Sequence, residues 1–175
     1  MQEAKQILQR YCHQGDKSAF NIFYRSQADR LWRFLRARGC SEQDAYDVLA
    51  EAFLKFIQVV CKDLRSPVAL LYRIAINLQI DTYRHQQASP IISDEQQIET
   101  RADGSADAGD EREYVRRLIK TLAENEQNLL LMRYWIGLTH REIANVLDLP
   151  EGTVRRQCSE AMKKLRQRWE EENDE

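Results

Sequence analysis

The sequence has almost no strand signal, because runs that alternate apolar and polar residues are nearly absent from its 175 residues. Apolar residues instead recur with a period of about 3.6 through most of the chain, which predicts an all-α fold. No apolar run approaches the roughly 20 residues that cross a bilayer, and the first residues lack a signal-peptide core. We therefore expect a soluble, cytoplasmic protein with no membrane insertion.

The residue patterns of common catalytic sites are also missing. The three histidines, His13, His85 and His140, share no metal-ligand spacing. There is no glycine-rich loop to hold a phosphate, and no nucleophile lies in a strand–turn–helix context. These absences argue against an enzyme, and we expect no metal and no cofactor.

The cysteines give no sign of pairing. Cys12, Cys40, Cys61 and Cys158 lie far apart in the sequence and form no CxxC motif. We therefore predict unpaired thiols in a reducing cytoplasm rather than a disulfide framework or a zinc site.

The net charge of −2 conceals a segregation of charge along the chain. Residues 1–85 carry a net +4 and residues 114–169 a net +5, whereas residues 86–113 carry −6 and residues 170–175 carry −5. Residues 86–111 lack periodicity and are rich in Asp, Gly, Ser and Ala, which is typical of a flexible linker. We predict two small helical domains, 1–87 and 112–170, joined by an acidic linker at 88–111 and followed by an acidic tail at 171–175. Each basic body suits a polyanion.

Residues 139–165 have the pattern of a helix-turn-helix. Thr139 and Glu142 form a capping box at one helix start, and Pro150 suits the start of a second helix. Apolar residues of the second helix recur at spacings of four, three and four, which places them in one arc: Val154, Cys158, Ala161 and Leu165. The segment 124–136, with Leu129, Leu130, Met132 and Tyr134, is expected to pack beneath this motif and to end at Gly137.

The opposite arc of the second helix is mainly basic and polar. It consists of Gly152, Arg155, Arg156, Ser159, Glu160 and Lys163. Arginine suits bidentate contact with guanine edges, and lysine or serine suits phosphate. We interpret this helix as a recognition helix for duplex DNA. The alternative is an ordinary helical hairpin with a solvated basic face.

Four helices are expected in the N-terminal domain, and three of them have clear starts. The first covers residues 2–13. The second begins at Asp16 or Ser18 and ends at Gly39, with a buried stripe of Phe20, Tyr24, Leu31 and Leu35. The third begins at Ser41 and has a regular apolar face up to Val60. Its residues Asp47, Glu51 and Lys55 lie at i, i+4 spacing on the exposed side, which by itself is typical of a solvated face.

The fourth helix follows Ser66 and Pro67, a cap and a first-turn proline in the preferred order. Its core positions are Leu71, Ile74, Ala75 and Leu78, and we place the following residues on the other side: Tyr72, Arg73, Ile76, Asn77, Gln79, Tyr83 and Arg84. Exposed rings stack unpaired bases, cations follow phosphates and amides read base edges, so this face suits single-stranded nucleic acid. The alternative is that Tyr72 and Tyr83 only cover another helix.

Three segments carry a family resemblance. Ala45 to Phe53 reads AYDVLAEAF, Leu71 to Asp81 reads LYRIAINLQID, and Leu129 to Val154 includes LLLMRYWIGLTHREIA and GTV. In this order and spacing they resemble the AEDLVQEVF, LYRIARNLAID and LLLRYxEGLSYEEIAxxLGxxxGTV segments of the extracytoplasmic-function (ECF, group 4) sigma factors of bacterial RNA polymerase. The resemblance covers nearly the whole chain except the first dozen residues, the linker and the tail.

The resemblance implies a non-enzymatic subunit that binds core RNA polymerase and directs transcription initiation at promoter DNA. The first domain would dock on the polymerase clamp and capture the melted minus-ten strand, and the second would sit on the polymerase flap and read the minus-thirty-five duplex. The linker would thread towards the active-site path, and an anti-sigma partner is expected because such partners are usual in the family.

By position, the resemblance assigns roles to individual residues, and neighbouring residues of the same segments complete the candidate sites. The clamp contacts would be Asp47, Glu51 and Lys55. The single-strand contacts would be Lys62, Arg65, Ser66, Tyr72, Arg73, Asn77, Tyr83 and Arg84. The duplex contacts would be Thr139, Gly152, Thr153, Arg155, Arg156, Ser159, Glu160 and Lys163.

The chain also departs from the family pattern. Tyr46 and Ala50 stand where Glu and Gln are usual, Leu70 where Trp is usual, and Ile76 and Glu160 where Arg is usual. Glu160 should reduce the affinity for phosphate and could instead accept from cytosine N4. Two other functions fit the residues: a free-standing helix-turn-helix regulator, or a helical protein-interaction module that binds through Ala45–Val60.

Overall fold

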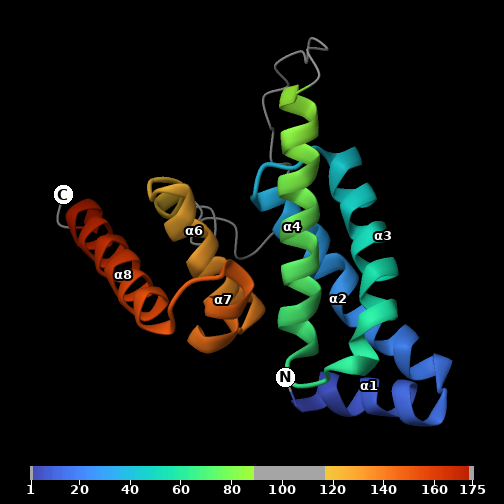
Figure 1. Ribbon diagram of the computed structural model, residues 1–175. Coiled ribbons are helices and arrows are strands. Elements are labelled where there is room, and N and C mark those ends of the chain that lie inside the picture. The colour runs from blue at the N-terminus through green and yellow to red at the C-terminus, as the bar shows by residue number, and fades with distance from the viewer. Residues whose placement is uncertain (1, 89–116, 174–175) are drawn as a thin grey trace. The chain divides into compact units, whose positions relative to one another are not determined.

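The computed structural model describes residues 2–88 and 117–173, and every regular element in those two stretches is helical (Figure 1). The chain divides into two compact units. The first holds α1 to α4, and the second holds α6, η2, most of α7, and α8. The predicted all-α fold is confirmed. The predicted linker lies, apart from Ala88, outside the described residues. No helix in the described stretches combines the length and the apolarity that a membrane span requires.

Four α-helices and one short turn form the first unit. They are α1 (Gln2–Gln14), α2 (Lys17–Ala37), α3 (Glu42–Val59), the 3₁₀ turn η1 (Val60–Lys62) and α4 (Pro67–Ala88). α4 packs along α3, α3 packs on α2, and α1 lies across one end of these helices (Figure 1).

Local capping explains where two of these helices begin. The Asp16 carboxylate accepts from the backbone N–H groups of Ser18 and Ala19 at 3.0 and 3.2 Å, and the Ser41 hydroxyl accepts from the N–H of Asp44 at 3.0 Å. These bonds satisfy donors that a helix start leaves unpaired. Gly39 follows α2 with φ +88°, a left-handed conformation that glycine adopts without steric cost. These helix boundaries could be predicted because the capping residues and the terminating glycine can be identified in the sequence.

An aromatic cluster forms the centre of the first unit. The rings of Phe23 and Phe56 are stacked with centroids 5.2 Å apart, and both side chains are fully buried. The prediction that Tyr24 is buried is wrong, because Phe23 takes the core position. Tyr24 is 39% exposed and contacts the rim of the cluster, 4.7 Å from the ring of Phe53.

The prediction of four unpaired thiols is also wrong. Cys12, in the last turn of α1, and Cys61, in η1, form a disulfide with Cα atoms 5.4 Å apart. The two residues are 49 positions apart in the sequence, so their proximity results from the packing of α1 against η1 and not from any local pattern. Cys40 and Cys158 are free, as predicted, and both are buried.

The second unit begins, among the described residues, with a helical turn at 117–120. α6 (Glu124–Leu130) continues directly into the π-helix η2 (Leu131–Ile136), which Gly137 ends with φ +82°. The prediction that Tyr134 packs inward is wrong, since its side chain is 63% exposed. A π-helix has more residues per turn than an α-helix, which shifts the faces that a regular 3.6-residue period predicts.

The helix-turn-helix follows as predicted. α7 (His140–Leu147) and α8 (Glu151–Asn173) are joined by a short turn in which Asp148 has φ +55°. Aspartate tolerates this left-handed conformation better than most residues. Ala161, Met162 and Leu165 of α8 pack with Leu122 and Leu130, which anchors α8 to α6.

Candidate nucleic-acid interface

The start of α7 is fixed by a reciprocal pair of hydrogen bonds. The Thr139 hydroxyl accepts from the backbone N–H of Glu142 at 3.2 Å, and the Glu142 carboxylate accepts from the backbone N–H of Thr139 at 2.8 Å. The predicted capping box is therefore present. It sets the direction in which α7 leads into the turn and α8.

α8 has one buried side and one exposed side. Val154, Cys158 and Ala161 are buried, whereas the side that we define as the α8 face is exposed: Gly152, Arg155, Arg156, Ser159, Glu160 and Lys163. Leu165 and Thr153 are half-buried. The α8 face therefore contains the six residues that the sequence pattern selected. A Cβ built on Gly152 would meet open space beyond its own helix backbone.

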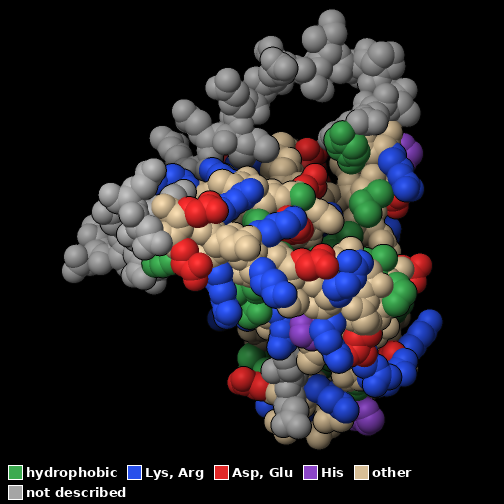
Figure 2. Space-filling view, turned by 90° about the vertical axis from the view of Figure 1, so that its left-hand side faces the viewer, with side chains coloured by type: hydrophobic (Ala, Val, Ile, Leu, Met, Phe, Trp, Pro, Cys, Tyr) green, Lys and Arg blue, Asp and Glu red, His purple; other side chains and the backbone are tan. Residues whose placement is uncertain are grey.

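Both arginines of the α8 face are held in ion pairs along the helix. Arg155 Nη2 donates to Glu151 Oε1 at 2.8 Å, and Arg156 Nη1 donates to Glu160 Oε1 at 3.1 Å. Exposed pairs of this kind contribute about 0–1 kcal/mol each, so a phosphate or a guanine edge can displace the carboxylate. On the face of the molecule that Figure 2 presents, basic and acidic side chains are interspersed.

The exposed side of α4 is narrower than the sequence predicted. Arg73, Asn77, Tyr83 and Arg84 are exposed, with Tyr83 at 61%. Arg84 lies 4.0 Å from the carboxylate of Asp81. These four residues, which we define as the α4 face, combine one exposed ring, one amide and two guanidinium groups. Such a combination can stack a base, read its edge and neutralise phosphate.

The prediction that Tyr72 is exposed is wrong. Its side chain is fully buried, its ring meets Phe34 edge-on at 5.1 Å, and Ile76 on the next turn is buried as well. Its hydroxyl finds no hydrogen-bond partner among the described residues, and burial raises the pKa of Tyr72. A ring in this position cannot stack on a base, so Tyr72 belongs to the core of the first unit. A sequence signal was present: Val68, Tyr72 and Ile76 recur at spacing four on one side of the helix.

Three of the predicted strand contacts lie at the end of η1 and in the loop that joins it to α4: Lys62, Arg65 and Ser66. The guanidinium of Arg65 forms a two-pronged pair with Asp63, in which Nη2 donates to Oδ2 at 2.7 Å and Nε donates to Oδ1 at 2.9 Å. The hydrogen bonds from Arg65 hold the pKa of Asp63 at about 2, and the same pair raises the pKa of Arg65. Lys62, the residue before Asp63, is exposed, and the Ser66 carbonyl accepts from Leu70 N–H in the first turn of α4.

The exposed side of α3 contains the predicted protein-contact residues. Asp47, Glu51 and Lys55 are all exposed; Glu51 pairs with Lys55 at 2.9 Å, and Asp47 accepts from the Gln43 amide at 3.2 Å. Leu54, 64% exposed, lies on the same helix. Single exposed apolar side chains are common on protein surfaces, so Leu54 alone does not mark a contact with another protein.

An aromatic and cationic cluster beside α3 was not predicted. The rings of Trp32 and Tyr46 lie 5.6 Å apart, and the guanidinium carbon of Arg36 lies 5.9 Å from the Trp32 ring centroid. Tyr46 is 53% exposed. Tryptophan, tyrosine and arginine are the residues that most often dominate protein interfaces. In the sequence, Tyr46 stands out only as a departure from the family pattern. Its contact with Trp32 depends on the packing of α2 on α3, which no local pattern predicts.

An apolar hollow of about 430 Å³ lies in the second unit, on α6, η2 and α8. Its walls are Ile119, Leu130, Leu131, Tyr134, Trp135, Met162 and Leu165. None of these residues belongs to the α8 face, so the hollow and the α8 face are separate features of the same unit.

Comparison with known proteins gives two family matches. Residues 23–89 match sigma-70 region 2, and residues 112–167 match sigma-70 region 4. The chain is 31% identical over 166 residues to the ECF RNA polymerase sigma-E factor of Escherichia coli K12, with 86% of each chain covered. It is 25% identical over 155 residues to the RNA polymerase sigma-E factor of Streptomyces coelicolor, with 87% of each covered.

Two solved structures share the fold. The sigma factor RpoE of Bartonella quintana, solved with the anti-sigma factor NepR, aligns with a TM-score of 0.62 and 17% identity over 85% of this chain and 94% of the other. CnrH, solved with the cytosolic domain of CnrY, aligns with a TM-score of 0.59 and 21% identity over 95% and 97%.

Proposed function

Because this chain belongs to the extracytoplasmic-function sigma factors of RNA polymerase, we propose that its two units divide promoter recognition between them. The chain is a sigma factor, a non-enzymatic initiation factor that binds core polymerase and promoter DNA. In our proposal the first unit captures the melted minus-ten strand, and the second reads the minus-thirty-five duplex. The α8 face is the observation that carries this proposal.

The α8 face enters the major groove. Arg155 and Arg156 exchange their glutamate partners for base edges, and Ser159 and Lys163 contact the phosphates on either side. Glu160, freed from Arg156, accepts from a cytosine amino group. Gly152, Thr153 and Thr139 lie at the two helix starts, where the absence of bulk and the backbone N–H groups favour a close approach to phosphate.

The α4 face and the preceding loop hold the single strand. Tyr83 stacks on an unpaired base, Asn77 reads a base edge, and Arg73 and Arg84 follow the phosphates. Lys62, Arg65 and Ser66 extend this surface, with Arg65 leaving Asp63 for phosphate. Tyr72 is not part of the proposed surface because it is buried.

Core polymerase is contacted by both units. Asp47, Glu51 and Lys55 on α3 meet the clamp, and the exposed Leu54 supplies apolar area at the same place. The apolar hollow of the second unit accepts an apolar helix of the flap, which leaves the α8 face free for DNA.

The remaining parts of the proposal concern the organisation and cellular setting of the protein. The domains span residues 1–87 and 112–170, with a linker at 88–111 and a tail at 171–175. The protein acts in the cytoplasm, belongs to group 4, and is held inactive by an anti-sigma factor. Two of the solved relatives are bound to such partners or to a cytosolic domain, which supports the last point.

Run-off transcription tests the proposal. Core polymerase is incubated with and without this protein on genomic fragments from its own source, and the transcripts are mapped. Polymerase-dependent initiation is expected. Duplex binding in the absence of core polymerase would instead indicate a free-standing regulator, and neither activity would indicate a protein-interaction module.

A double substitution tests the α8 face itself. Arg155→Ala with Arg156→Ala should cost about 1–3 kcal/mol per base-contacting residue and abolish dependence on the upstream element. Unchanged promoter selection would remove both residues from the interface. Arg117→Ala, at an exposed position of the same unit outside the α8 face, is the matched control.

A further inference from the structure

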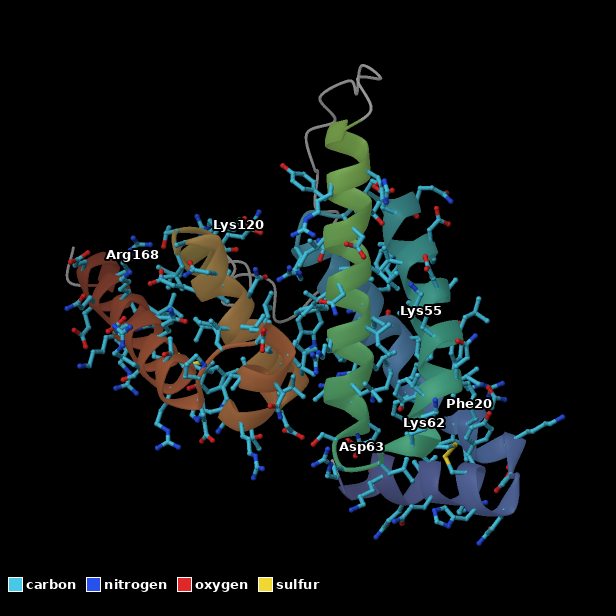
Figure 3. All side chains as sticks on the ribbon, in the orientation of Figure 1. Phe20, Lys55, Lys62, Asp63, Lys120 and Arg168 are labelled. Carbon is cyan, nitrogen blue, oxygen red and sulfur yellow. A yellow bond between two sulfur atoms is a disulfide. The ribbon has the colours of Figure 1, made fainter. Side chains whose placement is uncertain are left out.

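The four cysteines fall into two classes with different environments. Cys12 is half-buried and Cys61 is exposed, and these two form the disulfide, which is visible as a yellow bond near Lys62 in Figure 3. Cys40 and Cys158 are buried and free. Burial raises the pKa of both free thiols, that of Cys40 to about 11, so they hold little of the reactive thiolate. The chain thus has one accessible pair and two inert thiols.

We propose that Cys12 and Cys61 form a reversible redox site that exchanges with low-molecular-weight thiols and disulfides such as glutathione, and that its oxidation orders the loop from Lys62 to Ser66. This inference rests on the proposed function in one respect, namely that the protein acts in the cytoplasm. Disulfides in that compartment are usually transient and redox-sensing, not permanent. In the bonded pair the Cα separation of 5.4 Å is an ordinary one for a disulfide, so the packing of α1 against η1 accommodates the bond.

The exchange balances in atoms and electrons. The Cys61 thiolate, the more exposed of the two, attacks one sulfur of oxidised glutathione and releases one glutathione thiolate, leaving a mixed disulfide on Cys61. The Cys12 thiolate then attacks the Cys61 sulfur and releases the second glutathione. Two protein thiols and one glutathione disulfide become one protein disulfide and two glutathione thiols, and two electrons pass to glutathione. Excess reduced glutathione reverses both steps.

How much the disulfide orders the loop from Lys62 to Ser66 depends on the other contacts that hold η1 in place. η1 is a single turn, anchored by the buried Val60 and by a bond from Asp63 N–H to the Val60 carbonyl at 3.3 Å. The disulfide adds a covalent link to α1, which is itself held by the buried Leu8. Cys61 immediately precedes Lys62, so the link restricts the part of the chain that carries Lys62 and Arg65. A loop that is ordered before binding loses less entropy when it binds a strand.

The chemical part of the proposal is tested on the full-length protein in glutathione buffers of graded redox ratio. Thiols are trapped with N-ethylmaleimide, and peptides are identified by mass spectrometry. The Cys12–Cys61 cross-linked peptide is expected to appear with oxidised glutathione and to disappear with reduced glutathione, while Cys40 and Cys158 are alkylated only after denaturation. A bond that never forms, or one that persists in full reducing buffer, would overturn the proposal.

The structural part is read by limited trypsin digestion. Cleavage of the Arg65–Ser66 bond should be about threefold slower in the oxidised protein than in the reduced protein, because cleavage requires local opening. Cleavage at Lys120–Thr121, in an exposed turn of the second unit, is the internal control and should not change. Reduced wild-type protein and Cys12→Ser should behave alike, and Cys40→Ala should retain the response. Equal cleavage at Arg65–Ser66 in both redox states would overturn this part.

The outcome for transcription separates this inference from the proposed function. Holoenzyme binding to a forked minus-ten template should be a few-fold tighter in the oxidised state. Initiation in both states with no redox effect on the loop would sink the inference and leave the sigma function standing. A redox effect on the loop without any polymerase-dependent initiation would support the redox site and contradict the proposed function.

Discussion

Gln79 and Arg38 form two hydrogen bonds, and Gln79 accepts in one and donates in the other. The Gln79 side-chain oxygen accepts from Arg38 Nε at 2.7 Å, and the Gln79 amide donates to the backbone carbonyl of Arg38 at 3.1 Å. Arg38 caps the C-terminus of α2, and Gln79 lies on α4, 41 residues later. This pair therefore ties the helix that presents the α4 face to the end of another helix.

Replacing Gln79 by alanine should destabilise the first unit. The substitution removes two partly buried hydrogen bonds, so the free energy of unfolding should fall by about 1–2 kcal/mol, as measured by urea denaturation. Gln43→Ala is the matched control, because its one bond to Asp47 is exposed, and it should change stability by less than about 0.5 kcal/mol. Equal effects of the two substitutions would show that the Gln79–Arg38 pair contributes nothing special.

Tyr72 and Tyr83 should respond to substitution in opposite ways. Tyr72→Phe removes a buried hydroxyl that has no partner among the described residues, so stability should rise by about 1 kcal/mol and fork-DNA binding should not change. Tyr83→Ala should leave stability nearly unchanged and weaken fork binding by about 1–3 kcal/mol, the amount typical of one stacked base. Stability is measured by thermal melting and binding by fluorescence anisotropy. Weaker fork binding by Tyr72→Phe would contradict the assignment of Tyr72 to the core.

Glu160 should limit the charge interaction of α8 with DNA. In Glu160→Gln the side chain keeps its shape but no longer neutralises Arg156. In non-specific complexes, where Arg156 reads no base edge, the released guanidinium should gain one phosphate contact, so the plot of log affinity against log salt should steepen by about 0.9 for non-specific duplex DNA. A titration at several salt concentrations measures this slope. Glu170→Gln, in an exposed position at the far end of α8, is the control, and an equal change in both variants would point to net charge alone.

Asp16 should contribute a pH-dependent part of the stability. Hydrogen bonds from Ser18 and from the N–H of Ala19, with Arg10 nearby, lower the pKa of Asp16 from 3.8 to about 2. A carboxyl group with a depressed folded-state pKa stabilises the fold above its unfolded pKa and loses this effect as the pH falls through the folded value. Asparagine can cap the helix without a charge.

The difference in melting temperature between wild type and Asp16→Asn isolates that charge. Wild type should melt higher near neutral pH, and the difference should shrink as the pH falls from about 4 towards 2. Asp63 has a depressed pKa in the same range, but it is present in both proteins and cancels. A difference that stays constant across this range would contradict the role of the Asp16 charge.

The parts of the fold that the sequence predicted are those governed by local chemistry. Ser41 and Thr139 cap the helices that they were expected to cap, Asp16 is the cap among the two candidates Asp16 and Ser18, and Gly39 and Gly137 end the helices before them. Each of these outcomes depends on residues within a few positions of one another. The exposure of the α8 face was predicted for the same reason, since the buried arc of α8 fixes the opposite one.

The parts that were missed depend on contacts between distant residues. Nothing near Cys12 indicates that Cys61 lies against it, and Tyr46 gains Trp32 as a neighbour only when α2 and α3 pack. Tyr72 is different, because its burial was predictable. Its spacing of four from Val68 and from Ile76 indicates a buried stripe, but its ring was interpreted as a surface for base stacking. The pairing of Arg155 with Glu151 was also readable, as the two residues are four positions apart.

The two sides of α8 should tolerate substitution differently. Val154, Cys158 and Ala161 are packed in the interior, so most changes there threaten folding, whereas Arg155, Ser159 and Glu160 project outward and can change without loss of the fold. If the α8 face reads duplex DNA as we propose, its specificity can be redesigned on an unchanged scaffold.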